Sequence, residues 1–382
     1  MVMRAFLIDD DDGAANSAQI FSTEMLTFEF KKPETLESFA KELFCAKPGM
    51  IVVDYRLDER VGDKDQAVSY KASTLAQYLR DLAGDGGSED FPIVLHSAEE
   101  KIREYFHPEK TAHDLFDHII KKSSRKDVDE EKRKLDALAD GYVRLLELRP
   151  YNDKLLVIFG LDKQRAHLID HQEIHDLAAT TTIPHIFARF ILKRLISRNG
   201  ILVDDLTVLA RCGVNANDDG NQRIFDELQR LGANYTGVFS GFRSMWWRLT
   251  VEIALEEWLG GVVNSFSAQE RAAALKQKFG YDFKPAKSAW SNSSNERFTH
   301  VCSICERPTL VAHSVAVHER LSGPLIERRR ICFNCIQEDR HMDRIDLRID
   351  ALDKPVEDAV RKGTIQGEQS GGTYGEGDGN CR

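Results

Sequence analysis

The sequence predicts an α/β domain at the N-terminus, a mostly α-helical central domain and a small cysteine-rich domain near the C-terminus. Short apolar runs alternate with helically spaced segments over residues 1–125, helical spacing continues to residue 290, and two Cys-x-x-Cys pairs follow. The length of 382 residues suggests two or three domains. Apolar residues make up 42% of the chain, which is enough for each domain to bury a core.

Four short apolar runs define the first domain, at residues 5–8, 51–53, 93–95 and 119–120. Each run is rich in β-branched residues, and helically spaced segments separate them. Short, continuous apolar runs of this kind are typical of buried strands in a parallel sheet. We therefore expect an α/β sheet with helices on both faces.

A polar residue follows each of these runs, where the predicted strand ends. Ligand sites in open α/β sheets gather at the carboxyl ends of the strands, so we expect these side chains to meet. Carboxylates are suitable ligands for Mg²⁺, and a carboxylate beside that ion can act as a nucleophile and carry an acyl phosphate. A hydroxyl and an ammonium group can then bind the phosphoryl oxygens. The residues concerned are Asp9, Asp10, Asp54, Ser97 and Lys121.

Four motifs in this order resemble the receiver domain of two-component response regulators. They are FLIDDDD at 6–12, IVVDYRL at 51–57, PIVLHSA at 92–98 and DHIIKK at 117–122. The resemblance covers residues 1–125 and implies a flavodoxin-like, doubly wound sheet of five parallel strands.

The resemblance also implies a role for each site residue. Asp9 and Asp10 would be the acidic metal pair, and Asp54 would be the phosphoacceptor. Asp54 and the backbone carbonyl of Arg56 would complete the Mg²⁺ site. Ser97 would be the switch hydroxyl and Lys121 the phosphate partner, with a histidine kinase or another phosphodonor as the partner protein.

The sequence departs from the family pattern at three places. Lys122 stands where the family usually has proline, His118 stands at the usual position of the switch aromatic residue, and residues 60–71 look like an insertion. The first two departures leave open whether the receiver still switches.

Composition and charge limit the remaining functions. No apolar run approaches the ~20 residues that span a bilayer, and the N-terminus leads directly into a predicted strand. We therefore expect a soluble, cytoplasmic protein. The net charge of −10 argues against wholesale nonspecific attachment to nucleic acid, although it does not exclude a local basic surface.

Residues 126–150 are interpreted as a linker helix. The highly charged segment KKSSRKDVDEEKRK marks the end of the receiver, and apolar residues then recur at helical spacing until Pro150. Such an apolar stripe suits either pairing in a homodimer or packing within the chain.

The central domain, residues 151–290, has a segment that resembles a winged helix-turn-helix. VDDLTVLARCGV and NQRIFDELQRLG are the candidate helices, and ANYTGVFSGFRSMWWR is the candidate wing. Residues 183–249 contain nine Lys and Arg against six Asp and Glu. Arg243 and Arg248 are the candidate phosphate contacts. The alternative is a helical protein-interaction domain with Trp246 and Trp247 in its core.

Three histidines in HLIDHQEIH recur at every fourth residue, at 167, 171 and 175. This spacing would place three imidazoles on one helical face, where two could bind a metal. The sequence lacks the glutamate of a zincin helix, so solvated surface histidines are the favoured interpretation.

Residues 291–352 are interpreted as a zinc module. In a cytosolic protein, two Cys-x-x-Cys pairs favour a metal over disulfides, and four thiolates at this spacing suit a tetrahedral Zn²⁺. The first pair is expected on a hairpin and the second at the start of a helix running toward Leu352, the treble-clef arrangement. The ligands are Cys302, Cys305, Cys332 and Cys335.

The treble clef also occurs in HNH nucleases, so we compared His313, His318 and His341 with that pattern. His313 is followed by serine, and no asparagine lies between it and Cys332, so the resemblance is thin. The basic run at 327–330 is interpreted as a solvated strand edge or a phosphate-contacting patch. Residues 353–382 are expected to form a flexible tail.

Together these features predict a response-regulator-like signalling protein with a helical and zinc-binding output module. Nucleic-acid binding is the favoured output, and a protein-interaction adaptor or phosphate sink is the alternative. An enzymatic output, such as a degenerate HNH-like nuclease, is least favoured. The sequence leaves open the cognate kinase, the output target, the oligomeric state and the pathway.

Overall fold

The computed structural model describes residues 2–58, 68–86, 89–98, 115–122, 128–293, 296–319, 323–342, 344 and 347–365. Most of the expected insertion at 60–71 lies outside these residues. Within the described part of the chain, no helix is long and apolar enough to cross a membrane.

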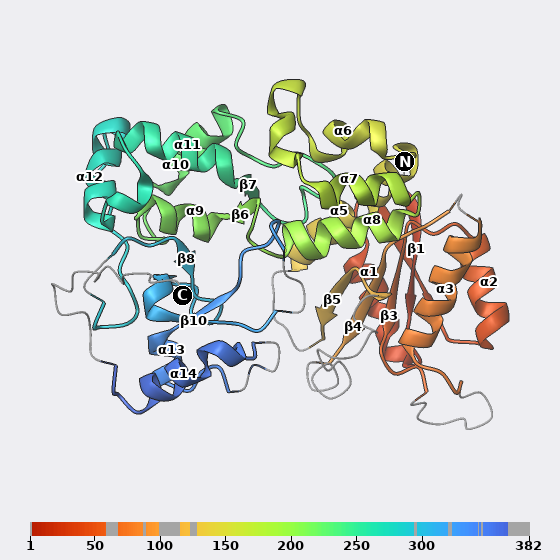
Figure 1. The fold of residues 1–382 in the computed structure, drawn as a ribbon. Coiled ribbons are helices and arrows are strands. Elements are labelled where there is room, and N and C mark those ends of the chain that lie inside the picture. Colours follow the sequence, from red (N-terminus) through yellow and green to blue (C-terminus); the bar gives the residue numbers. More distant parts are fainter. Residues whose placement is uncertain are drawn as a thin grey trace, which may run out of the picture. The chain divides into compact units, whose positions relative to one another are not determined.

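The N-terminal part is built on a sheet of five parallel strands (Figure 1). The strand order is β2-β1-β3-β4-β5, which is the flavodoxin-like, doubly wound order. This confirms the fold class expected from the sequence. The strands are β1 (Met3–Ile8), β2 (Leu26–Lys31), β3 (Met50–Asp54), β4 (Ile93–Ser97) and β5 (His118–Lys121).

Strand β2 is the one strand that none of the four apolar runs identified. It lies at the edge of the sheet and alternates buried with exposed residues along its first half. A strand with one solvated face shows this two-residue period and lacks a continuous apolar run.

Helices cover both faces of the sheet. Because successive side chains on a strand point to opposite faces, Leu7, Val52 and Val94 pack on one side, and Phe6, Ile51 and Leu95 pack on the other. The first face is covered by α1 (Ala15–Phe21) and α5 (Val128–Glu147). The second face is covered by α2 (Leu36–Cys45) and α3 (Ala72–Gly86).

Helix α5 is the segment that the sequence assigned to a linker. The structure places it against the sheet, where Leu135, Leu138 and Tyr142 are buried in the same core as the strands. The apolar stripe of this helix therefore packs within the chain.

The central part of the chain is mostly helical, as expected. Its strands β6 and β7 pair antiparallel, and an additional bridge joins Asn234 to Trp246. The two tryptophans of β7 are buried. The elements in chain order are η4 (Asn152–Lys154), α6 (Leu155–Phe159), η5 (Lys163–Ile169), α7 (Gln172–Thr180), α8 (Pro184–Phe190), η6 (Ile191–Ile196), β6 (Leu202–Asp204), α9 (Asp205–Cys212), α10 (Asn221–Arg230), β7 (Met245–Trp247), α11 (Arg248–Leu259), η7 (Val263–Ser265) and α12 (Ala268–Phe279).

The C-terminal part consists of small strand pairs and short helices around a compact apolar core. Trp290, Val315, Ile331 and Phe333 are buried in it. A helix also forms within the segment expected to be a tail, where Val360 is buried. The elements are β8 (His300–Val301), β9 (Pro308–Thr309), η8 (Val311–His313), β10 (Ser314–Ala316), β11 (Arg330–Cys332), α13 (Phe333–Gln337), η9 (Ala351–Asp353) and α14 (Lys354–Arg361).

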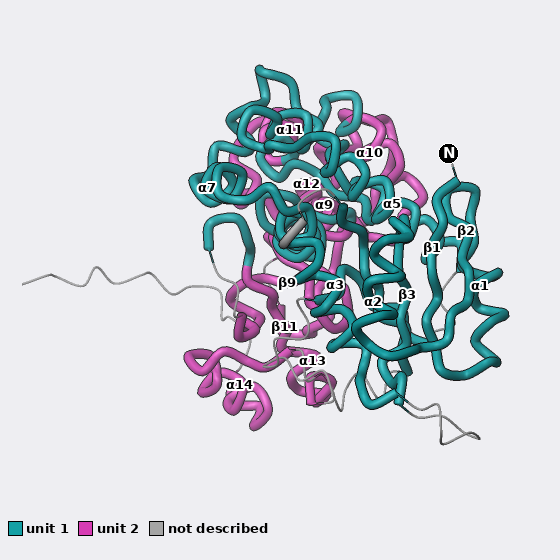
Figure 2. Tube along the Cα trace, turned by 90° about the vertical axis from the view of Figure 1, so that its right-hand side faces the viewer, with its two compact units in different colours: residues 1–205, 228–251, 321–327 teal, residues 206–227, 252–320, 328–382 magenta. Residues whose placement is uncertain are grey.

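The chain folds as two compact units, shown in separate colours in Figure 2. The first comprises residues 1–205, 228–251 and 321–327, and the second comprises 206–227, 252–320 and 328–382. In the first unit one continuous core contains the sheet, α5 and the central helices. The N-terminal sheet domain and the first central helices therefore share one hydrophobic interior.

A buried polar network also joins the N-terminal sheet domain to these helices. Arg80 of α3 donates to Asp90 at 3.0 Å and to Asp117 at 2.7 Å. Asp90 accepts from the backbone N–H of His185 at 2.7 Å and lies 2.8 Å from its Nδ1, at the start of α8. The Tyr142 hydroxyl of α5 donates to Asp117 at 2.8 Å.

Candidate functional site

Three carboxylates meet at the carboxyl ends of β1 and β3, as the sequence predicted. Asp9 and Asp10 directly follow β1, and Asp54 is the last residue of β3. One carboxylate oxygen of each lies within 4.8 Å of the others. Asp9 and Asp54 are buried, whereas Asp10 is partly exposed. A compact set of carboxylate oxygens suits a hard cation such as Mg²⁺.

The ammonium group at these carboxylates belongs to Lys122. Its Nζ lies 2.6 Å from Oδ1 of Asp54 and 2.9 Å from Oδ2 of Asp9. The sequence assigned this position to Lys121, which is exposed at the end of β5. Lys122, which stands where the family usually has proline, therefore binds two of the three carboxylates. The role of Lys121 as the phosphate partner stays a prediction.

Backbone N–H groups orient the two buried carboxylates. Asp54 Oδ2 accepts from the N–H of Arg56 at 2.9 Å, and Asp9 Oδ1 accepts from the N–H of Asp11 at 3.0 Å. The Arg56 guanidinium binds Asp58 at 2.7 Å. The role of the Arg56 backbone carbonyl as a Mg²⁺ ligand stays a prediction.

Ser97 ends β4 beside this cluster. Its carbonyl accepts from the N–H of Lys122 at 2.9 Å, which ties the end of β4 to the lysine. The Ser97 side chain is fully buried, and its hydroxyl has no hydrogen-bond partner among the described residues. A buried hydroxyl without a partner is unfavourable, so a group that accepts its hydrogen bond would be stabilised there.

Burial and nearby charges have opposite effects on the pKa values of Asp54 and Lys122. Burial raises the pKa of Asp54 above its ordinary value, although the Lys122 charge and hydrogen bond act against it. Burial lowers the pKa of Lys122, but the two carboxylates raise it more, so it lies above its ordinary value. The ammonium group therefore stays charged at neutral pH.

His96 is a neighbour that the sequence analysis did not identify. It pairs with Asp54 across β3 and β4, and its ring packs edge-on against Phe21 at 5.2 Å. Burial, together with the Lys122 charge, lowers the pKa of His96 to about 4. The imidazole is therefore neutral at pH 7. In the sequence His96 is one residue of a buried strand motif, and no pattern there indicated that it would lie beside Asp54.

His118, at the opposite end of β5 from the carboxylates, is held on two sides. Its Nε2 lies 2.8 Å from Oε2 of Glu131 on α5, and its ring lies edge-on to Phe242 at 5.2 Å. Burial raises the pKa of Glu131, but His118 and Lys134 outweigh it and lower the pKa to about 2.

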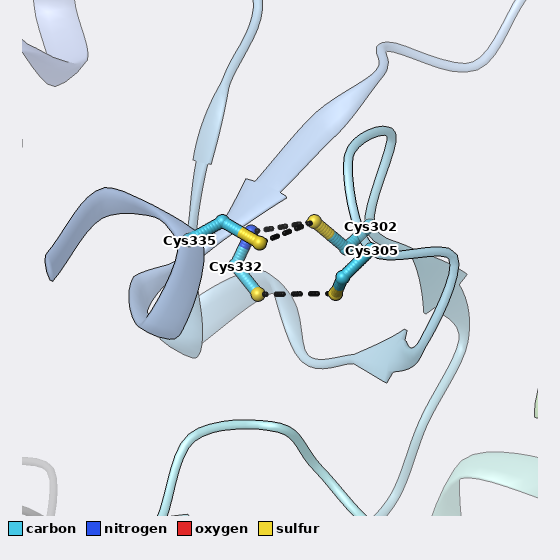
Figure 3. Close-up of side chains that lie close together, drawn as sticks. All are labelled: Cys302, Cys305, Cys332 and Cys335. Carbon is cyan, nitrogen blue, oxygen red and sulfur yellow. Dashed lines mark hydrogen bonds between the residues drawn. The ribbon is translucent and has the colours of Figure 1, made fainter. Parts of the chain in front are cut away.

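The four predicted zinc ligands converge in the second unit (Figure 3). The sulfurs of Cys302 and Cys335 lie 3.8 Å apart, and those of Cys305 and Cys332 lie 3.7 Å apart. Sulfurs at about 2.3 Å from one tetrahedral Zn²⁺ lie about 3.8 Å from each other. The cluster therefore has the dimensions of a four-thiolate zinc site.

Local structure explains this convergence. Cys302 and Cys305 lie on the turn between β8 and β9, and Cys332 ends β11 directly before α13, which carries Cys335. The hairpin and the helix start both agree with the expected arrangement. The helix was expected to run toward Leu352 but ends at Gln337. Shortly after this end, Asp339 adopts a left-handed backbone conformation with φ of 53°.

The histidines of the nuclease comparison serve other contacts. His313 packs edge-on against Trp290 at 4.7 Å, and its Nδ1 lies 3.0 Å from Oγ of Ser293. His341 Nε2 lies 2.9 Å from Oε1 of Glu357. Within the described residues, only the acidic cluster and the cysteine cluster bring three or more metal-binding side chains together.

The three histidines at 167, 171 and 175 do not share one helix. His167 lies in η5, His171 precedes α7, and His175 lies within α7. The chain leaves helical geometry at Asp170, so the expected common face does not form.

The basic residues considered for nucleic acid have internal partners. Arg243 pairs with Asp204, and Arg248 lies at the start of α11. The basic run at 328–330 is also engaged, because Arg329 binds Glu319 at 2.7 Å and Arg330 binds Ser314 at 2.7 Å.

No family model matches the chain, and no curated protein matches it. Among similar solved structures is a CheY-like response regulator receiver domain from Methylobacillus flagellatus, 14% identical over 36% of this chain and 99% of that chain, with a TM-score of 0.28. A receiver domain protein from Clostridium thermocellum is 6% identical over 38% and 99%, with a TM-score of 0.29. The Legionella pneumophila response regulator LqsR is 12% identical over 44% and 54%, with a TM-score of 0.28.

The sheet order and the helices on both faces give the N-terminal part a flavodoxin-like, doubly wound fold, with the acidic cluster at its strand ends.

Proposed function

We propose that the chain is a response-regulator-like signalling protein whose Asp54 accepts a phosphoryl group in a Mg²⁺-dependent reaction. The donor is a histidine kinase or another phosphodonor. The observation that carries this proposal is the grouping of Asp54 with Asp9, Asp10 and the Lys122 ammonium at one edge of the sheet.

Each residue has a chemical task in this reaction. An oxygen of Asp54 forms a bond to phosphorus as the bond between phosphorus and the donor breaks. Asp9, Asp10 and Asp54 would hold the Mg²⁺ ion, which would offset charge on the phosphoryl oxygens. Lys122 exchanges the Asp54 carboxylate for a phosphoryl oxygen, and the Ser97 hydroxyl donates to another.

For the output, one observation favours a phospho-regulated protein-interaction adaptor over nucleic-acid binding. Arg243, a candidate phosphate contact, already binds Asp204. A nucleic-acid phosphate would have to displace that carboxylate. The helical and zinc-binding parts therefore serve best as a protein-binding output.

Acetyl phosphate with Mg²⁺ tests the phosphorylation step. Wild-type protein is expected to gain one phosphoryl group, which is released by base as expected of an acyl phosphate. Asp54→Asn is expected to gain none. Asp58→Asn is the matched control, because Asp58 is a nearby carboxylate bound to the Arg56 side chain. Equal labelling of wild type and Asp54→Asn would contradict the proposal.

A further inference from the structure

A short segment of the C-terminal part belongs to the core of the first unit. This strap, residues 323–327, lies in the sequence between β10 and β11, which pair antiparallel within the second unit. The strap itself is part of the first unit, where Leu325 is fully buried in the same core as the sheet and α5. The chain therefore leaves the β10–β11 pair, contributes a leucine to the first unit and returns to β11.

Backbone hydrogen bonds hold the strap beside the residues that precede β6. The Ile201 N–H donates to the carbonyl of Leu325 at 3.1 Å, and the Glu327 N–H donates to the carbonyl of Asn199 at 2.7 Å. Gly200 forms an antiparallel bridge with the strap at Ile326. The strap thus pairs with the first unit as an extended peptide pairs with the edge of a sheet.

Glycine at position 200 allows this close approach. A Cβ on Gly200 would lie 1.9 Å from the carbonyl oxygen of Leu325, so a side chain at this position would exclude the strap. At the other end, Gly323 has a φ of 147°, and a Cβ there would lie 3.3 Å from Nη2 of Arg194. The path of the strap therefore depends on a glycine beneath it and a glycine at its start.

The strap is too short to stay ordered on these contacts alone. One buried leucine and a few backbone hydrogen bonds oppose the conformational entropy lost when five residues are fixed. That entropy cost falls when the ends of a segment are already held close together. The β10–β11 pair provides this restraint, because Ala316 pairs with Arg330 and the Val317 N–H donates to the carbonyl of Arg329 at 2.9 Å.

The cysteine cluster holds β11 in turn. Cys332 is the last residue of β11, and its N–H donates to Sγ of Cys302 at 3.3 Å. The Ser303 N–H, beside that cysteine, donates to the carbonyl of Arg330 at 2.9 Å. Metal binding supplies folding free energy in small metal-binding domains, so the order of β11 depends on the metal.

We propose that the strap stays on the first unit only while the four-cysteine site holds its metal. Metal loss disorders β11, frees the two ends of the strap and releases Leu325 from the core. The first unit then exposes the apolar surface that Leu325 covers, together with the Ile201 N–H and the Asn199 carbonyl. This inference rests on zinc binding by the cysteine cluster and does not depend on phosphorylation of Asp54.

Hydrogen–deuterium exchange tests the strap in the full chain, with and without removal of zinc by a chelator. The amides of Ile201 and Glu327 are expected to exchange faster by roughly tenfold or more after zinc removal. The Val238 amide is the internal reference, because it donates to Ile158 within the first unit and is expected to keep its rate. Metal content is measured on the same samples by mass spectrometry, so failure to bind zinc is distinguished from failure of the strap to respond.

Zinc affinity tests the same coupling in the opposite direction, because the effect of one site on another is reciprocal. Leu325→Ala loosens the strap and leaves the cysteines intact, so we expect it to weaken zinc binding by roughly fivefold or more in competition with a chromogenic chelator. Leu352→Ala is the matched control, because Leu352 is 83% exposed, and its zinc affinity is expected to equal that of wild type.

Four outcomes would overturn the proposal. The first two are unchanged exchange at Ile201 and Glu327 in a chain shown to have lost its zinc, and equal acceleration at Val238, which would indicate general unfolding. The others are wild-type zinc affinity in Leu325→Ala and a purified chain that binds no zinc.

Discussion

The Nζ of Lys122 lies 2.6 Å from Oδ1 of Asp54 and 2.9 Å from Oδ2 of Asp9, so one ammonium group joins the carboxylates that follow two adjacent strands. The same ammonium group is placed to bind a phosphoryl oxygen once Asp54 is modified.

Lys122→Ala is expected to weaken beryllofluoride binding at least tenfold, because a charge-assisted hydrogen bond contributes about 1.5–3 kcal/mol and ~1.4 kcal/mol corresponds to a factor of ten. Titration of the protein with beryllofluoride at fixed Mg²⁺ measures the effect. Lys121→Ala is the matched control and is expected to bind as wild type does. If Lys121→Ala weakens binding and Lys122→Ala does not, the assignment returns to Lys121.

The sequence alone could not decide between Lys121 and Lys122 as the lysine at the carboxylates. The apolar runs located the strand ends, and with them Asp9, Asp10 and Asp54. The run of two lysines at the end of β5 did not show which of them would bind the carboxylates, and the structure pairs Lys122, the residue after the strand, with Asp54 and Asp9.

Contacts between residues far apart in the sequence could not be predicted either. The apolar stripe of α5 predicted a helix but not its partner, and the structure places that stripe on the sheet. Asp90 and His185 lie 95 residues apart, and no local pattern in the sequence connects them. The cysteine cluster was predictable because the spacing within each pair already restricts the geometry.

Acid is expected to destabilise the first unit through His96. Burial lowers its pKa to about 4, below the ordinary value of 6.5, so the unfolded chain takes up a proton between these values that the folded chain does not. Stability from this source is full above pH 6.5 and is lost as the pH falls, by about 2 kcal/mol at pH ~4.5.

Urea denaturation at several pH values measures this loss. His96→Phe is expected to flatten the dependence between pH 6.5 and 4.5, since phenylalanine cannot take up a proton and can still pack on Phe21. His167→Gln is the control, because His167 is exposed. An unchanged pH dependence in His96→Phe would rule out this source.

Arg80→Met is expected to destabilise the first unit by about 3–5 kcal/mol, because it leaves the buried carboxylates of Asp90 and Asp117 without their shared cation. Chemical denaturation measures the change. Arg4→Met is the matched control, since its ion pair with Glu29 is about half exposed and such pairs contribute roughly 1 kcal/mol or less. Similar losses in both variants would contradict a special role for the buried network.

The cysteine cluster is expected to bind a single zinc ion per chain. Cys302→Ser is expected to lose most of this zinc and to make the second unit sensitive to protease, because metal binding contributes to the folding of small metal-binding domains. Mass spectrometry of the metal content and limited proteolysis provide the measurements. Cys45→Ser is the control, because Cys45 is exposed and lies on α2, outside the cluster. Full protease resistance of a zinc-free preparation would contradict the expectation.

The two output hypotheses differ in how binding responds to salt. For the adaptor, we expect no detectable affinity for mixed-sequence duplex or single-stranded DNA at about 50 mM salt, where electrostatic attraction is strong. If the chain binds DNA through Arg243 and Arg248, replacing both with alanine reduces the salt slope by about two units, one for each lost contact. Asp204→Asn sharpens the comparison, because it frees Arg243 from its internal carboxylate. Tighter DNA binding by Asp204→Asn than by wild type, with weaker binding by the double alanine variant, would overturn the adaptor proposal.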